Sequence, residues 1–359
     1  MPAVFSAGNR GKSSVYGEYL IMEEPPIPRR EAKVRIAQAG YEPPSDDQID
    51  RWHSEGLLCE QPSTGRPLAH GYSETQVRRL IAIARIVAAL KSQRVRSSEI
   101  AFGLCVNGAI DVPPGLVCEH VEVAVRAFQA KIRRILNEIG SRNEGFYVGF
   151  LGKARKLGGL LAKNILLKAI PSLARSGFAR EVIGTTIGLF LRALAKPVQY
   201  GELAGDIRRT TTALRPDSMP PTRQALRELF ATISDASQLL RLDEENAMLL
   251  AIRTVGDSGE IFSVVEFTRN LLAVASRFFP WMTNPNAVPW LDAEDREFLR
   301  RYSIPVVCGA MATIRANEYT KGLAADLRAG NTGRASVEFA QMKQFGDYFV
   351  GAISVKEVE

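Results

Sequence analysis

Apolar residues that recur three and four positions apart restrict the fold of this chain more than any other feature of its sequence. The clearest run has six members: Val121, Val125, Phe128, Ile132, Ile135 and Ile139. Steps of four, three, four, three and four residues place them on one side of a helix, in the heptad pattern typical of paired helices. We call these residues the heptad seam. They predict a long helix over about Cys118–Ile139, which either pairs two subunits or packs on the core of its own domain.

Beyond Gly140 the same helical spacing continues to the end of the chain, and we find no alternating run typical of a strand. Proline and glycine lie at most of the joints between helices. The expected helices are Phe146–Lys163, Ile165–Leu173, Arg180–Leu194, Gly201–Leu214, Thr222–Leu240, Asp243–Val255, Ser263–Phe278, Asp292–Tyr302, Pro305–Leu327 and Arg334–Phe349. We therefore expect a mainly α fold, with residues 141–359 forming an all-helical effector or oligomerisation domain.

The N-terminal third is divided into shorter elements. Glycine and proline make residues 1–30 a predicted flexible arm. Helix-capping residues then indicate four short helices: Glu31–Ala39 closed by Gly40, a second from Ser45 to Gly56, a third opened by Ser73 and Gln76, and a fourth from Ser97 or Ser98 to Leu104. Between the second and third, Cys59–Tyr72 contains too much proline and glycine for a helix and suits a β-hairpin.

This order of elements resembles the DNA-binding head of the MerR family of transcription regulators. The sequences that carry the resemblance are Gly56-Leu57-Leu58, Gly71-Tyr72-Ser73-Glu74 and Ser97-Ser98-Glu99-Ile100. In that family a reading helix ends before Gly-Leu-Leu, the wing closes on Gly-Tyr, and a short helix precedes a long antiparallel dimerisation helix. The resemblance covers about residues 31–139. It implies a winged helix-turn-helix over 31–117 and a linking or dimerisation helix over 118–140.

The resemblance also implies contacts to double-stranded DNA. Gln48 and Arg51, on the second helix, are expected to contact base edges or phosphates. Arg66, His70 and Tyr72 are expected on the wing, and Arg78 and Arg79 are expected to face phosphate from the start of the third helix.

Three acidic residues depart from the family pattern, because Asp46, Asp47 and Asp50 lie on the helix that should read bases. Unpaired carboxylates repel a polyanion. Either these side chains point away from DNA or accept from cytosine N4, or the module has lost DNA binding and contacts protein.

Charge and cysteine usage give the remaining expectations. The chain carries a net charge of +7, and its basic excess follows the head, over residues 118–175. The four cysteines form no CxxC pair, and the first residues lack the apolar core of a signal peptide. We expect a cytoplasmic protein with reduced thiols and no membrane contact.

Other motifs indicate no chemistry. Ser6–Ser13 imitates a phosphate-binding loop, but only five residues precede it and prolines soon follow. Cys118 and His120 lack the further thiolates of a metal-sensing site, so a buried free thiol is the preferred interpretation. We therefore expect no cofactor, no metal and no enzymatic activity.

The sequence as a whole predicts a DNA-binding transcription regulator that forms a homodimer or higher homo-oligomer. Its C-terminal domain is expected to sense a small ligand or a protein partner. The alternative is an interaction or structural scaffold protein that uses the winged head for a protein contact.

Overall fold

The computed structural model describes residues 26–58, 71–90, 95–140, 247–280, 284 and 293–354. Among them, the side chains of Ile132 and of residues 135–140 and 345–354 are not described. The predicted arm up to residue 25, the predicted hairpin from 59 to 70 and the helices expected between 141 and 246 lie outside the described residues.

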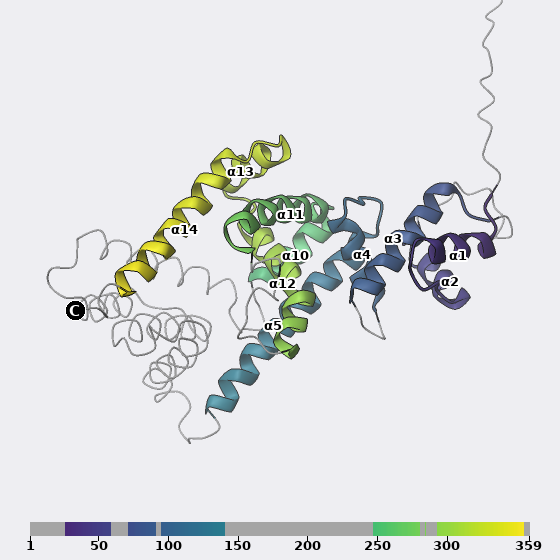
Figure 1. Ribbon diagram of the computed structural model, residues 1–359, viewed down its shortest axis with the longest axis horizontal. Coiled ribbons are helices and arrows are strands. Elements are labelled where there is room, and N and C mark those ends of the chain that lie inside the picture. Colours follow the sequence, from purple (N-terminus) through teal and green to yellow (C-terminus); the bar gives the residue numbers. More distant parts are fainter. Residues whose placement is uncertain are drawn as a thin grey trace, which may run out of the picture.

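The described part of the chain is mainly α, as predicted, and it contains no β-strand. Its only extended pairing is an antiparallel bridge between Ile27 and Tyr72. The helices are α1 (Arg29–Gln38), α2 (Asp46–Ser54), α3 (Glu74–Leu90), α4 (Ser97–Val106), α5 (Pro114–Gly140), α10 (Ala247–Asp257), α11 (Ile261–Phe278), α12 (Ala293–Ile314), α13 (Glu318–Arg328) and α14 (Gly333–Ser354). Helices α1 to α3 form one end of the molecule, and α5 runs through a central bundle with α10, α11 and α12 (Figure 1).

Local capping explains where the N-terminal helices begin and end. Ser45 and Gln48 form a capping box at the start of α2, in which the Gln48 side chain accepts from the Ser45 N–H at 2.8 Å. Ser73 and Gln76 form the predicted box at α3. After α1, Gly40 adopts a φ of +87°, the left-handed conformation that closes a helix at low cost for glycine.

The long helix begins four residues earlier than predicted. Pro114 takes its first position, where a missing N–H costs nothing because that group has no partner inside the helix. Its N-terminal half is not a free linker. Val121 and Val125 are fully buried in one core with α4, α10 and α12.

The first half of the heptad seam is therefore covered by this chain's own helices. Gly309 on α12 lies so close that an added Cβ would stand 3.2 Å from the Val125 side chain. Phe128 stacks on Phe298 of α12, with ring centroids 6.4 Å apart. Val121, Val125 and Phe128 therefore pack on the core of their own domain, the second of the two alternatives for the seam. The side chains of Ile132, Ile135 and Ile139 lie outside the described ones.

The predicted break before Pro305 is wrong, because α12 continues through this residue to Ile314. Proline removes one backbone hydrogen bond and normally bends or ends a helix. Here Pro305 is buried where α12 packs on α5 and α10, and this tertiary packing holds the helix together. The chain breaks instead at residues 315–317, where the Asn317 side chain caps α13.

The aromatic residues at the end of α11 pack on α14. Phe278 stacks on Phe339 at 6.3 Å, and Phe279 meets the same ring edge-on at 6.4 Å. These two aromatic side chains therefore serve the packing of α11 on α14. None of the helices in the described part is long and apolar enough to span a bilayer.

Candidate nucleic-acid interface

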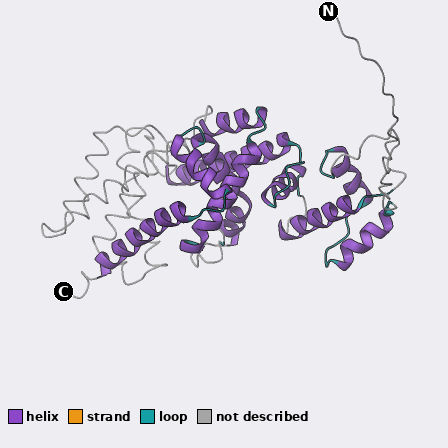
Figure 2. Cartoon of the chain, turned by 90° about the horizontal axis from the view of Figure 1, so that it is seen from above, coloured by secondary structure: helices purple, strands orange, loops and turns teal. Residues whose placement is uncertain are grey.

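Helices α1 and α2 are held at an angle by a small apolar core. Ile36 of α1 and Ile49 and Trp52 of α2 are buried there together with Leu57 and Leu58 of the following turn. Seen from above, α1, α2 and α3 stand apart from the central bundle, to which α4 leads (Figure 2). The arrangement gives α2 an outward face.

Two of the three acidic residues of α2, Asp46 and Asp50, are paired within the head. Asp46 Oδ1 forms an ion pair with Lys33 Nζ at 2.8 Å and lies 3.5 Å from a terminal nitrogen of Arg29. Asp50 accepts a hydrogen bond from each of the two terminal nitrogens of the Arg29 guanidinium. The hydrogen bond from Lys33 lowers the pKa of Asp46, so its charge persists but is compensated.

The pairing follows from helix geometry. Residues four apart lie on one side of a helix, so Arg29 and Lys33 form one row on α1 while Asp46 and Asp50 form another on α2. These rows face each other across the turn. Asp46 and Asp50 therefore pair with α1 although they stay 60% and 54% exposed, whereas Asp47 is exposed and has no partner among the described residues.

Arg51 lies about 100° around α2 from Asp50, because each residue of an α-helix turns by that angle. Its side chain is exposed and makes no hydrogen bond or ion pair with the described residues. Gln48 is also exposed, but its carbonyl oxygen is engaged in the Ser45 capping box. This leaves its amide N–H groups as donors.

The other predicted contact residues divide into exposed and buried ones. Arg78 is 77% exposed on α3 and lies 3.4 Å from Glu74. Arg79, its neighbour, is 9% exposed and pairs with Asp111 in the loop before α5. Consecutive residues on a helix point in different directions, so Arg78 faces solvent and Arg79 joins α3 to the α4–α5 loop.

Tyr72 is only 2% exposed, which removes it from the surface on which a direct DNA contact was expected. Its backbone exchanges two hydrogen bonds of 2.8 Å with Ile27, and its hydroxyl accepts from Arg29 Nε at 3.1 Å. Tyr72 therefore positions the arginine that pairs with Asp50. Arg66 and His70 lie outside the described residues.

The basic surface expected after the head is partly paired as well. Lys131 forms an ion pair with Asp295 of α12 and lies 4.5 Å from the centre of the Phe298 ring. Arg126 lies 3.5 Å from Glu122, one turn earlier on α5. The basic residues from Arg142 to Arg175 lie outside the described part of the chain.

An ion pair with a buried carboxylate joins the head to the C-terminal helices. Glu99 of α4 accepts from the Arg96 N–H at 3.0 Å and pairs with Arg301 of α12. Next to it, the His120 ring lies between Phe102 and Tyr302, at centroid distances of 5.1 and 6.5 Å. Burial lowers the pKa of His120 to about 4, so its imidazole is neutral at physiological pH.

Sequence reasoning missed the pairs that organise this region. A sequence signal for the ion pairs between α1 and α2 did exist. Two cations spaced four apart, Arg29 and Lys33, are followed by two acids at the same spacing, Asp46 and Asp50. No sequence signal points from Glu99 to Arg301, because they lie 202 positions apart.

Three of the four cysteines lie in the described ranges, and Cys59 lies outside them. Cys105, Cys118 and Cys308 are buried and form no disulfide, and burial raises the pKa of Cys118 to about 11. Within the described ranges, no three histidine, cysteine or acidic side chains are grouped so that they could hold a metal ion.

Comparisons of the chain with protein-family models, with curated proteins and with solved structures found no match. A function for this chain is therefore argued from its own residues and their arrangement.

Proposed function

We propose that this protein is a DNA-binding transcription regulator whose MerR-like head reads double-stranded DNA with α2. The observation that carries the proposal is the neutralisation of Asp46 and Asp50 by Lys33 and Arg29. It weakens the main objection to DNA binding, since two of the three carboxylates on this helix are compensated and only Asp47 is not. Arg51 then remains as an exposed cation on α2.

The outer surface of the head offers further groups for DNA. An α-helix fits the major groove, where arginine binds guanine edges and amide groups bind adenine. Arg51 and Gln48 have the chemistry for these contacts. Arg78 on α3, together with Arg66 and His70 in the proposed wing, would contact the flanking phosphates.

Pairing of two subunits belongs to the same proposal. Its support is the sequence pattern of Ile132, Ile135 and Ile139, which continues the heptad seam beyond Phe128. Two heads related by such a helix pair would bind two half-sites of one operator.

The direct test is the affinity of the full chain for duplex DNA from its own promoter region, measured by fluorescence anisotropy. Arg51→Ala should weaken binding about tenfold, the effect of losing one good base contact. The matched control is Arg300→Ala, because Arg300 is an exposed arginine of α12 whose partner is Glu297, one turn away. Equal affinities of native protein and Arg51→Ala would contradict the proposed role of Arg51.

A protein-interaction scaffold is the second candidate function. Two observations favour it: Tyr72 and Arg79 are buried, so they offer little surface to DNA, and Asp47 is exposed on the same helix as Arg51. The salt dependence of duplex binding separates the two functions. A DNA-binding head loses affinity steeply as salt rises, whereas a scaffold shows no duplex binding even at low salt.

A further inference from the structure

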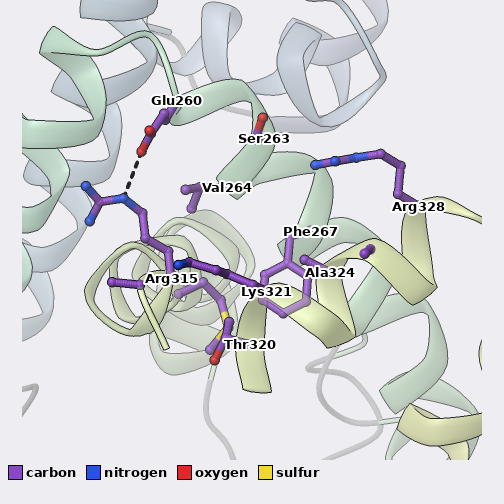
Figure 3. A pocket seen from close by; sticks show the side chains of 12 residues that line it. Glu260, Ser263, Val264, Phe267, Arg315, Thr320, Lys321, Ala324 and Arg328 are labelled. Carbon is purple, nitrogen blue, oxygen red and sulfur yellow. Dashed lines mark hydrogen bonds and ion pairs between the residues drawn. The ribbon is translucent and has the colours of Figure 1, made fainter. Parts of the chain in front are cut away.

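A pocket lies beside the C-terminal end of α12, far along the chain from the head. It has a volume of about 510 Å³ and is lined by residues of α11, α12, α13 and the turn before α13 (Figure 3). Pockets that bury small organic ligands have volumes of about 300–1,000 Å³. The size is therefore that of a small-molecule site.

The floor of the pocket is apolar. Val264 and Phe267 come from α11, Met311 from α12 and Ala324 from α13. Val264 and Phe267 are at least nine-tenths buried, so they form a fixed surface rather than a flexible rim. Such a floor favours the hydrocarbon part of a ligand.

The charged lining is mostly positive. Three of its side chains are cations, Arg315, Lys321 and Arg328, and one is an anion, Glu260. Arg315 donates to Glu260 at 2.9 Å, as the dashed line in Figure 3 shows, so these two charges compensate each other. Lys321 and Arg328 provide the remaining charge.

The present partners of Lys321 and Arg328 are exposed acids outside the lining. Lys321 pairs with Glu318, which is 87% exposed, and Arg328 lies 3.4 Å from Glu266. Solvent-exposed pairs of this kind contribute about 0–1 kcal/mol. Both cations can therefore turn to an anion in the pocket at small cost.

A hydroxyl group adds a hydrogen-bond donor beside these cations. Thr320 is 7% exposed and lines the pocket, yet its side chain makes no hydrogen bond to any described residue. The other described threonines of this region, Thr268 and Thr313, donate to the carbonyl four residues earlier. The Thr320 hydroxyl is thus available for a ligand.

From these groups we infer that the pocket binds a small amphipathic organic anion. Its negative group pairs with the cationic lining that Lys321 and Arg328 provide, the Thr320 hydroxyl offers a further hydrogen bond, and its hydrocarbon part covers Val264 and Phe267. The inference rests on the proposed function in one respect, since it names the ligand class for the effector domain of the proposed regulator.

The pocket is connected to the head through α11. Arg269, two residues beyond Phe267, donates to the Val106 carbonyl at the end of α4 at 3.4 Å. Helix α11 also packs on α4 and α12. A ligand that shifts α11 would therefore act on the helix that leads to the head.

The test is isothermal titration calorimetry of the full chain, without DNA, using octanoate and the neutral analogue 1-octanol as probes. Octanoate should show saturable binding. Lys321→Gln combined with Arg328→Gln should weaken octanoate binding about tenfold or more, because loss of one hydrogen bond between charged groups is enough to change the affinity about tenfold. The same change should leave 1-octanol binding unaltered.

Two further variants complete the design. Ala325→Trp, at an exposed lining position of α13, should obstruct the pocket and abolish binding of both probes. Arg300→Gln on α12, outside the lining, should bind octanoate as the native protein does. Circular dichroism establishes that each variant is folded.

The inference is overturned if native protein does not bind octanoate, or if the Lys321/Arg328 double variant binds it as tightly as native protein. Neither result bears on the proposed DNA contact, which is measured on ligand-free protein with Arg51→Ala. Failure of the pocket and failure of the DNA-binding proposal are thus separate outcomes.

Discussion

The ion pairs between α1 and α2 have exposed carboxylates, whereas the carboxylate of the ion pair between α4 and α12 is buried. Asp50 is 54% exposed and its partner Arg29 33%, while Glu99 is 3% exposed and its partner Arg301 25%. The first pairs join residues at most 21 positions apart, and the second joins residues 202 positions apart. Both connect two helices, but the surrounding medium differs.

The difference separates two uses of charge in one chain. In water, an ion pair contributes little to stability, yet it still decides which sign of charge a surface presents. In the interior, removing one partner leaves a charge that neither water nor protein compensates. We therefore expect changes at α1–α2 to act on DNA binding and changes at α4–α12 to act on folding.

The largest effect is expected for Arg301→Met. It leaves the Glu99 carboxylate buried without its cation and should lower the free energy of unfolding by about 3 kcal/mol. Urea denaturation measures this loss. Glu99→Gln combined with Arg301→Met should recover most of it, because the glutamine oxygen can still accept from the Arg96 N–H. A double variant as unstable as the single one would show that the buried charge is not the cause.

The pH dependence of stability should reveal His120. Its pKa is about 4 in the folded chain and about 6.5 when unfolded, so below pH 6.5 protons bind preferentially to the unfolded state. This group's contribution is complete above pH 6.5 and is lost as the pH falls toward 4. It amounts to about 2 kcal/mol between pH 7 and pH 5.

His120→Phe isolates that contribution, since the new ring fits between Phe102 and Tyr302 and does not titrate. The buried Nδ1 of His120 has no hydrogen-bond partner among the described residues, so phenylalanine leaves no polar atom unsatisfied. Urea denaturation at several pH values should show a shallower acid-side loss in the variant. If the free energy of unfolding depends on pH in the same way in both proteins, His120 is not the cause of the loss of stability in acid.

A smaller loss of stability is expected from a larger side chain at Gly309, where α12 packs closely on α10 and α5. A Cβ on Gly309 would meet Met248 Sδ at 2.8 Å, closer than real contacts allow. Gly309→Val should therefore cost about 1–3 kcal/mol in thermal or urea denaturation. Ala310→Val, at the next and less buried position, controls for the β-branched side chain and should cost less. Equal costs would indicate that α12 can shift to accommodate the valine.

The smallest effect on stability is expected for Arg29→Gln, under about 1 kcal/mol, because the pair with Asp50 is exposed. Duplex affinity should nevertheless fall, since Asp50 then presents an uncompensated carboxylate. Arg29→Gln combined with Asp50→Asn should restore the affinity. If Arg29→Gln instead destabilises the chain as much as Arg301→Met, the contrast between the two ion pairs is wrong.

The sequence predicted local features of the head well. Ser45, Ser73 and Gly40 were assigned to helix ends, and the structure places them there. The expected surface contacts were less successful, because Tyr72 and Arg79 belong to contacts with Ile27 and Asp111 that no local pattern indicates.

By itself, the sequence determined the ends of the capped N-terminal helices and which helix faces are apolar. Capping and periodicity act over about four residues, so one stretch of chain contains the necessary information. Tertiary structure decided what each face meets: α10 and α12 cover Val121 and Val125, α12 continues through Pro305, and Glu99 pairs with Arg301. Those partners are distant in the chain, and their choice depends on how all the helices pack together.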